Sequence, residues 1–145
     1  MNTGKNPLFT DFKALFEQAT TIAIIGCSSN RYRTSNQIAE YLQESGYRII
    51  PVNPNETDVL GEKAYPSIQD LPRDYAVDIV AIFRNKRHTP DMLAEITEWS
   101  HQTGQKPVVW TQLDVSHPEA EEMAGNHQLP YVRNRCIMVE HRAST

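Results

Sequence analysis

The fold is decided by the stretch Thr21-Ile22-Ala23-Ile24-Ile25-Gly26, a continuous apolar run that ends at a glycine. Such a run is typical of a strand that is buried on both faces of a parallel sheet. A polar loop follows, and residues 35–45 then carry apolar side chains at helical spacing before Gly46, which predicts a helix stopped by that glycine. The stretch therefore predicts a strand–loop–helix unit, the building block of an alternating α/β fold.

The same alternation continues along the chain. Apolar runs predict further strands at 47–52, 77–83, 107–113 and 129–133, with a short edge strand at 61–65, and helical spacing predicts helices at 89–103 and about 116–125. The first of these helices opens at Thr89 and Pro90 and stops at Gly104, and the second begins with a capping box from Ser116 to Glu119. Residues 135–142 give no clear prediction.

These elements predict a three-layer α/β fold. Its doubly wound, mostly parallel, Rossmann-like sheet has the strand order 3-2-1-4-5-6 with a short edge strand 3, and an N-terminal helix at about 7–19 is added to it. Asn6 is the expected cap of that helix and Pro7 its first residue. We expect a single domain over 1–145 with its core at about 20–142. Pro51 lacks an N–H group, so one side of the second strand should be unpaired there.

Length and composition exclude several classes of protein. The chain has 145 residues, of which 39% are hydrophobic and 22% charged, the balance of a globular domain. Its longest apolar runs are too short to span a membrane, and its start lacks a secretion signal. Only Cys27 and Cys136 occur, which fits a reducing cytoplasm better than a disulfide scaffold. The formal net charge of −4 argues against a nucleic-acid partner.

Positive charges gather beside two predicted strand ends. Arg31 and Arg33 follow the first strand, and Arg84, Lys86 and Arg87 follow the fourth. In a doubly wound sheet these strands are neighbours where the winding reverses, and ligands bind there beyond the carboxyl ends. We therefore predict a crevice for a compact anion. Scattered surface arginines are the alternative that charge alone leaves open.

The loop after the first strand has the parts of an anion site. Gly26 lets the backbone approach a ligand closely, and the next helix offers free N–H groups at its N-terminus. Hydroxyl and guanidinium groups are supplied by Ser28, Ser29, Arg31, Arg33, Thr34 and Ser35. The alternative is an ordinary polar loop with a conventional helix cap at Thr34 or Ser35.

Enzymatic motifs are weak. Only Gly26 of a Gly-x-Gly-x-x-Gly fingerprint is present, Asn53-Pro54-Asn55 stands where a nicotinamide site would have an acidic residue, and there is no P-loop motif. The helix N-terminus near Cys27 could lower the pKa of its thiol, but no histidine is close in sequence, so a packing role is favoured. The histidines and cysteines lack zinc spacing. We predict no catalytic residues and no metal site.

Four segments carry a family resemblance. They are Ile24–Ser28 with Arg33 and Ser35; Gly46–Pro54; Val77–Arg84; and Val109–Leu113 with the closing Arg135–His141. In this order, from about residue 20 to 142, the chain resembles the small bacterial CoA-binding proteins of the YccU type, Rossmann-like domains similar to the CoA-binding domain of the succinyl-CoA synthetase alpha subunit. The chain departs from the family at four positions. It has Arg31 and Thr34 where the family commonly has proline, Asp114 where glycine is common, and Asn134 where aspartate is common.

The resemblance implies a ligand and its contacts. Gly26, Ser28, Arg33 and Ser35 would hold the diphosphate of CoA; Asn53 and Pro54 would lie near the adenosine and its 3′-phosphate; Phe83 and Arg84 would flank the adenine side; and Gln112 would face the pantetheine arm. Cys27, Ser29 and Arg31 of the same loop complete the predicted CoA or acyl-CoA site. Asp114 would add a negative charge near the channel of that arm.

The predicted function is that of a non-catalytic CoA or acyl-CoA binding protein of the cytoplasm. One alternative is an enzyme that uses the same crevice, either an NADP-dependent reductase, which the missing glycines disfavour, or an acyl or thiol transferase. Another is a regulatory module that has lost its ligand. The sequence leaves open which acyl group is carried, and whether a homodimer forms through the C-terminal strand or the N-terminal helix.

Overall fold

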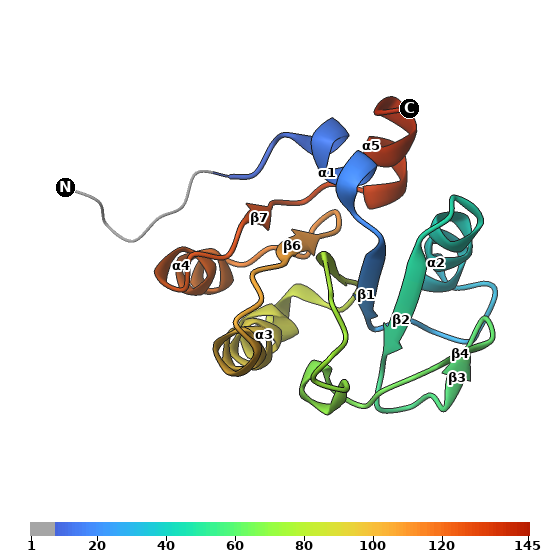
Figure 1. Cartoon of the computed structure of the whole chain (residues 1–145), viewed down its shortest axis with the longest axis horizontal. Coiled ribbons are helices and arrows are strands. Elements are labelled where there is room, and N and C mark those ends of the chain that lie inside the picture. The colour runs from blue at the N-terminus through green and yellow to red at the C-terminus, as the bar shows by residue number, and fades with distance from the viewer. Residues whose placement is uncertain (1–7) are drawn as a thin grey trace.

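The computed structural model describes residues 8–145, and its main element is a parallel sheet in the order β2-β1-β5-β6-β7 (Figure 1). The strands are β1 (Thr21–Ile25), β2 (Arg48–Val52), β3 (Asp58–Val59), β4 (Glu62–Lys63), β5 (Ile79–Ile82), β6 (Val108–Thr111) and β7 (Tyr131–Val132). Every pair in the main sheet is parallel, and Ile24 of β1 lies opposite Pro51 on one side and Ala81 on the other. The predicted Rossmann-like α/β fold is confirmed.

The predicted strand order is right for five strands and wrong for the short third one. In place of a sixth strand, residues 58–63 form the separate antiparallel pair β3-β4, and Tyr65 makes a single parallel bridge to Val52. Tyr65 donates its N–H to Pro51 O at 3.0 Å and accepts from Asn53 N at 2.8 Å. Because Pro51 has no N–H to offer on this outer side, pairing does not extend beyond the bridge.

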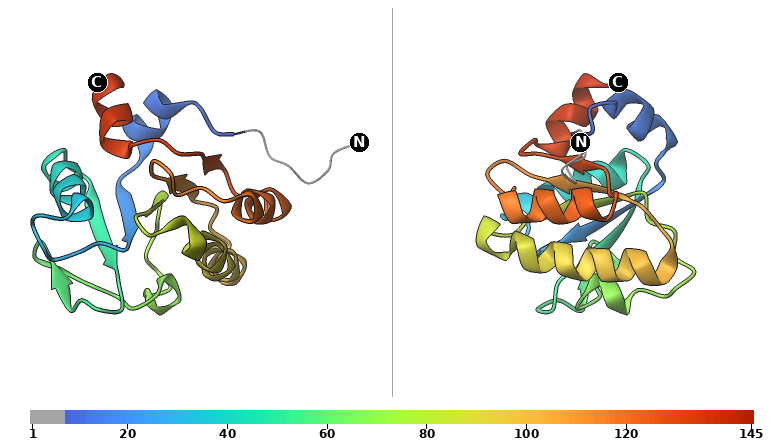
Figure 2. Two further views of the ribbon diagram at one scale, coloured as in Figure 1. Left: turned by 180° about the vertical axis from the view of Figure 1, so that it is seen from behind. Right: turned by 90° about the vertical axis from the view of Figure 1, so that its left-hand side faces the viewer.

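Helices cover both faces of the sheet. They are α1 (Phe12–Gln18), α2 (Thr34–Glu44), α3 (Thr89–Thr103), α4 (Pro118–Asn126) and α5 (Ile137–Ala143), with short 3-10 turns η1 (Ile68–Asp70) and η2 (Lys86–His88). Figure 1 shows α2 on one side of the sheet and α3 and α4 on the other, and Figure 2 shows α3 and α4 side by side. Within residues 8–145, none of these helices has the length and apolar character needed to cross a membrane.

The alternation of side chains along β1 divides the core into two halves. Ala23 and Ile25 belong to the half that packs on α3 and α4, whereas Ile22 and Ile24 belong to the half that packs on α1, α2 and α5. All four side chains are buried, as the continuous apolar run predicted. The strand ends therefore stay fixed between two packed layers, and the loops that follow them are held at one edge of the sheet.

The ends of the chain differ from the sequence-based expectation. The N-terminal helix begins at Phe12, with Asp11 as its cap, rather than near residue 7, and Phe9 N instead donates to Tyr131 O beside β7. The expected cap Asn6 and the expected first residue Pro7 lie outside the described residues. The tail that gave no clear prediction forms α5, and α5 packs against α1 and α2.

Candidate functional site

A cleft of ≈ 540 Å³ lies beyond the carboxyl ends of β1 and β5, where the winding of the sheet reverses. Its lining consists of Gly26, Ser28, Arg33, Thr34, Ser35, Asn53, Asn55, Glu56, Phe83, Arg84, Gln112 and Val115. A second hollow of ≈ 390 Å³ shares Gly26, Asn53, Asn55, Phe83 and Arg84 with it and continues past Pro54 toward α3. Both basic segments of the sequence thus contribute an arginine to one cleft.

Gly26 sets the path of the chain from β1 into this cleft. Its φ of +85° lies in the left-handed region that glycine adopts without strain. A Cβ atom there would come within 2.5 Å of Phe83 O and 2.9 Å of Arg84 Cγ. The loop can therefore turn closely over the end of β5 only because residue 26 has no side chain.

The start of α2 leaves hydrogen-bond donors free. Arg33 is the N-cap residue, and its side chain makes no capping bond. The hydroxyl of Ser35 accepts from Ser28 N at 3.0 Å instead of capping the helix. Within residues 8–145 the N–H groups of Thr34 and Ser35 therefore have no hydrogen-bond acceptor. This excludes a conventional cap at Thr34 or Ser35 and leaves the positive end of an 11-residue helix at the cleft.

Side-chain amides hold the loop that leads to α2. Asn36 Nδ2 donates to Ser28 O at 2.9 Å, and Asn53 Nδ2 donates to Cys27 O at 3.1 Å. The hydroxyl of Ser28 accepts from Asn30 N at 3.0 Å, which closes the next turn. These three hydrogen bonds fix the shape of the loop in the absence of a ligand.

Two arginines give the cleft its positive charge. Arg33 is exposed at the start of α2, and Arg84 is half-buried after β5, where its Nη1 lies 3.9 Å from Met92 Sδ. Neither guanidinium pairs with a carboxylate within the described part of the chain. Unpaired guanidinium groups beside free backbone N–H groups are the donor set that phosphate oxygens require.

Cys27 does not line the cleft. Its side chain is fully buried in the core half that contains α2. Burial, with a smaller contribution from the negative charge of Glu56, raises the pKa of Cys27 to about 12. The expectation that the helix N-terminus could lower this pKa is wrong, because burial of the side chain disfavours the charged thiolate. Cys27 packs as a small apolar residue.

The other predicted site residues divide into two groups. Gly26, Ser28, Arg33, Ser35, Asn53, Phe83, Arg84 and Gln112 line the cleft, and Pro54 lines the adjoining hollow. Ser29 and Arg31 are exposed and line neither; Ser29 N donates to Glu56 Oε2 at 2.8 Å, and Arg31 Nη2 donates to Tyr32 OH at 3.1 Å.

Glu56 is a cleft residue that the sequence analysis missed. A nicotinamide site would have its acidic residue directly at the end of the second strand, where Asn53 stands in this chain. The chain turns back after Asn53, with Glu56 N donating to Asn53 O at 3.3 Å, and this turn carries the carboxylate into the cleft. The Asn-Pro-Asn turn signal was the feature that could have placed it there.

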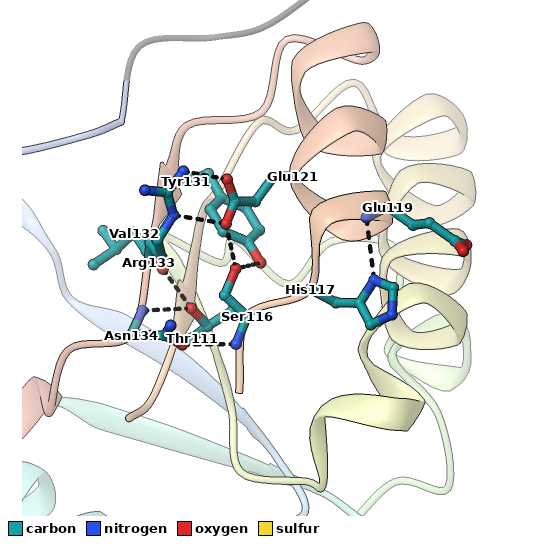
Figure 3. Close-up of polar contacts among 9 residues, drawn as sticks. All are labelled: Thr111, Ser116, His117, Glu119, Glu121, Tyr131, Val132, Arg133 and Asn134. Carbon is teal, nitrogen blue, oxygen red and sulfur yellow. Dashed lines mark hydrogen bonds and ion pairs between the residues drawn. The ribbon is translucent and has the colours of Figure 1, made fainter. Parts of the chain in front are cut away.

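The far wall of the cleft is formed by the loop after β6, and Asn134 fixes it. Its side-chain oxygen accepts from Val115 N at 3.1 Å. The same oxygen accepts from Ser116 N at 2.8 Å, and the backbone N–H of Asn134 donates to Thr111 Oγ1 at 2.9 Å (Figure 3). Gln112 is buried in this wall, and its Oε1 accepts from Ile137 N at 3.0 Å. The wall is thereby tied both to β7 and to the start of α5.

Two residues of this wall adopt an unusual backbone conformation. Asp114 has a φ of +58° and Asn134 a φ of +51°. Aspartate and asparagine tolerate this left-handed conformation better than most side chains, which is why aspartate can stand where glycine is common. The Asp114 carboxylate lies 3.4 Å from Lys86 Nζ, so its negative charge is partly balanced.

The predicted capping box at the start of α4 is wrong. The cap is His117, whose Nδ1 accepts from Glu119 N at 3.1 Å (Figure 3). The Ser116 hydroxyl instead donates to Glu121 Oε2 at 2.7 Å and lies 2.8 Å from Tyr131 OH. The preference of Ser116 for a tertiary contact with β7 overrides its local capping tendency.

The residues described contain no group of three histidine, cysteine or acidic side chains placed to hold a metal ion.

Comparison with known proteins supports one family. The model of the CoA binding domain family matches residues 20–142. YneT of Bacillus subtilis is 32% identical over 137 residues, covering 94% of this chain and 96% of that protein. A hypothetical protein from Pyrococcus horikoshii OT3 has a solved structure that superimposes with a TM-score of 0.84 at 32% identity, covering 99% of this chain and 98% of that one. The acetate–CoA ligase [ADP-forming] II of Archaeoglobus fulgidus is 32% identical over 90 residues, which are 61% of this chain and 13% of the ligase.

Proposed function

The chain belongs to the CoA binding domain family, and we propose that it binds CoA or an acyl-CoA with the diphosphate seated on the start of α2. The observation that carries this proposal is the pair of free N–H groups at Thr34 and Ser35, which face the same cleft as Arg33 and Arg84. A diphosphate supplies the oxygen acceptors and the negative charge that this set of donors lacks.

The two directions of the cleft suit the two arms of CoA. From the start of α2 the hollow toward Pro54 would take the adenosine and its 3′-phosphate, with Phe83 and Arg84 beside the adenine. In the other direction the cleft reaches Gln112, which would face the pantetheine arm. Arg84 belongs to both hollows and can balance charge on either side of the diphosphate.

We further propose that the protein binds its ligand without chemistry. The nucleophile that the sequence offered, Cys27, is buried, and with a pKa of about 12 its thiol stays protonated near neutral pH. An acyl or thiol transfer through Cys27 would require a thiolate that this environment opposes. Binding without reaction requires only the donors and charges described above.

Calorimetric titration with CoA tests the proposed site. Arg33→Ala removes a guanidinium at the start of α2, and we expect it to weaken CoA binding by about tenfold or more, because a hydrogen bond to a charged group contributes roughly 1.5–3 kcal/mol. Arg31→Ala, on the same loop but outside the cleft, should change the affinity little.

The same titration can contradict the proposal. Equal CoA affinity for the wild type and Arg33→Ala would remove the start of α2 from the site. Melting curves with CoA, NADP and ATP in parallel identify the ligand class, because a ligand that binds the folded state raises the melting temperature. A larger rise with NADP than with CoA would favour the reductase alternative.

A further inference from the structure

A separate, smaller groove of ≈ 350 Å³ lies beside the Gln112 wall of the cleft. The groove is lined by Leu113, Arg133, Asn134, Arg135, Cys136, Val139 and Glu140. The groove thus lies between the loop that follows β6 and the start of α5. Nothing in the proposed contacts of the phosphates or the adenosine uses it.

The groove and the cleft share a wall. Gln112 lines the cleft and Leu113, its neighbour in the chain, lines the groove. The Gln112 side chain accepts from Ile137 N, directly after the groove residue Cys136. Val115 of the cleft donates its N–H to the groove residue Asn134 at 3.1 Å. A chain-like ligand that leaves the cleft over Gln112 therefore meets the groove next.

Two of the apolar side chains that line this groove are exposed to solvent. Leu113 is 67% exposed and Val139 is 52% exposed, and they are two of only four large hydrophobic side chains that the described residues expose. Leu113 comes from the loop after β6 and Val139 from α5, so they approach the groove from different elements. Exposed apolar side chains that border one hollow favour an apolar occupant.

The charged groups around the groove are already paired. Arg133 is bound in bidentate fashion by the Glu121 carboxylate, and Arg135 lies 3.3 Å from Glu140. Asp114, next to Leu113, is 86% exposed in its side chain and is balanced only by Lys86. Each guanidinium that lines the groove thus already has a carboxylate partner, and the negative charges of Glu140 and Asp114 oppose the entry of a further carboxylate.

We propose that this groove holds the acyl group of an acyl-CoA and selects an uncharged aliphatic chain over free CoA and over an acidic acyl group; this inference rests on the CoA-binding function proposed above. The pantetheine arm passes Gln112, and the acyl chain lies between Leu113 and Val139. Burying several methylene groups there supplies the selectivity, because each contributes to binding in proportion to the apolar area removed from water.

Titrations with CoA, butyryl-CoA and succinyl-CoA test this selection. We expect the wild type to bind butyryl-CoA about tenfold more tightly than CoA or succinyl-CoA, as expected for a few buried methylene groups. Leu113→Asp and Val139→Asp should weaken the binding of butyryl-CoA much more than that of CoA, and so abolish this preference. Leu8→Asp is the matched control, because Leu8 is another exposed leucine that does not line the groove.

The outcomes separate the two proposals. If CoA binds but butyryl-CoA and succinyl-CoA bind equally well, the acyl groove is overturned while the CoA function stands. If none of the three binds, the CoA function itself fails, and the groove fails with it. If the Asp variants change the oligomeric state in size-exclusion chromatography and leave the butyryl preference intact, the groove is a contact between copies of the chain and the acyl assignment is overturned.

Discussion

The start of α2 and the cluster around His141 use polar groups in opposite ways. At the start of α2 the N–H groups of Thr34 and Ser35 find no acceptor within residues 8–145, and neither of the two guanidinium groups in the cleft is paired with a carboxylate of those residues. At His141, Nδ1 lies 2.6 Å from Tyr41 OH, and Tyr47 OH donates to Phe16 O at 2.6 Å. The free groups are available to a ligand, whereas the paired groups hold α1, α2 and α5 together.

Packing shows the same contrast. His141 is only 9% exposed, and its ring meets the rings of Phe16, Tyr41 and Tyr47 edge-on, with centroids 5.2–5.5 Å apart. The cleft is open, and its arginines touch solvent. Stability is therefore expected to depend on the His141 cluster and on close backbone packing, and ligand affinity on the cleft charges.

The largest expected effect is a loss of stability when the close backbone packing beneath the cleft is disturbed. Gly26→Ala places a Cβ against Phe83 O in a left-handed conformation, and we expect a loss of about 3 kcal/mol in the free energy of unfolding. Gly46→Ala is the matched control: its φ is +102°, but no atom lies within 4 Å of the added Cβ, so only about 1 kcal/mol should be lost. Urea unfolding measures both, and equal losses would show that the close approach to β5 is unimportant.

A smaller effect sharpens the role of charge in the cleft. Glu56→Gln keeps an oxygen that can accept from Ser29 N but removes a negative charge beside the proposed phosphate site. We expect CoA to bind about threefold more tightly, a gain that shrinks as salt is added. Glu62→Gln, in β4 and outside the cleft, is the control. Weaker CoA binding by Glu56→Gln would mean that the carboxylate contacts the ligand favourably.

The smallest effect concerns pH and belongs to the His141 cluster. Burial lowers the pKa of His141 below its ordinary value of 6.5, so the folded state favours the neutral ring. The unfolded chain then binds a proton first as the pH falls, and the free energy of unfolding should decrease below about pH 6.5. Urea unfolding at about pH 7.5 and 5.5 should show a smaller decrease in His141→Phe than in the wild type. An identical decrease in both proteins would assign the pH dependence to other groups.

The sequence predicted most of the fold because apolar runs and helix-ending glycines act on neighbouring residues in the chain. The run Thr21–Gly26 became β1, Gly104 ended α3 in a left-handed conformation, and the two basic segments met at one cleft. Two failures depended on the partners that the fold supplies or withholds. Ser116 bonds to Glu121 and lies beside Tyr131 instead of capping α4, and residues 61–65 could not continue the sheet beside Pro51.

The amino-acid sequence alone determined most of the strands and helices, a glycine turn after the first strand and the membership of a CoA binding domain family, because periodicity and motif spacing are written along the chain. The tertiary structure alone decided that Cys27 is buried, that Glu56 enters the cleft, and that α2 begins without a cap. Burial and hydrogen-bond partners depend on residues far apart in the chain, and only the folded arrangement brings those residues together.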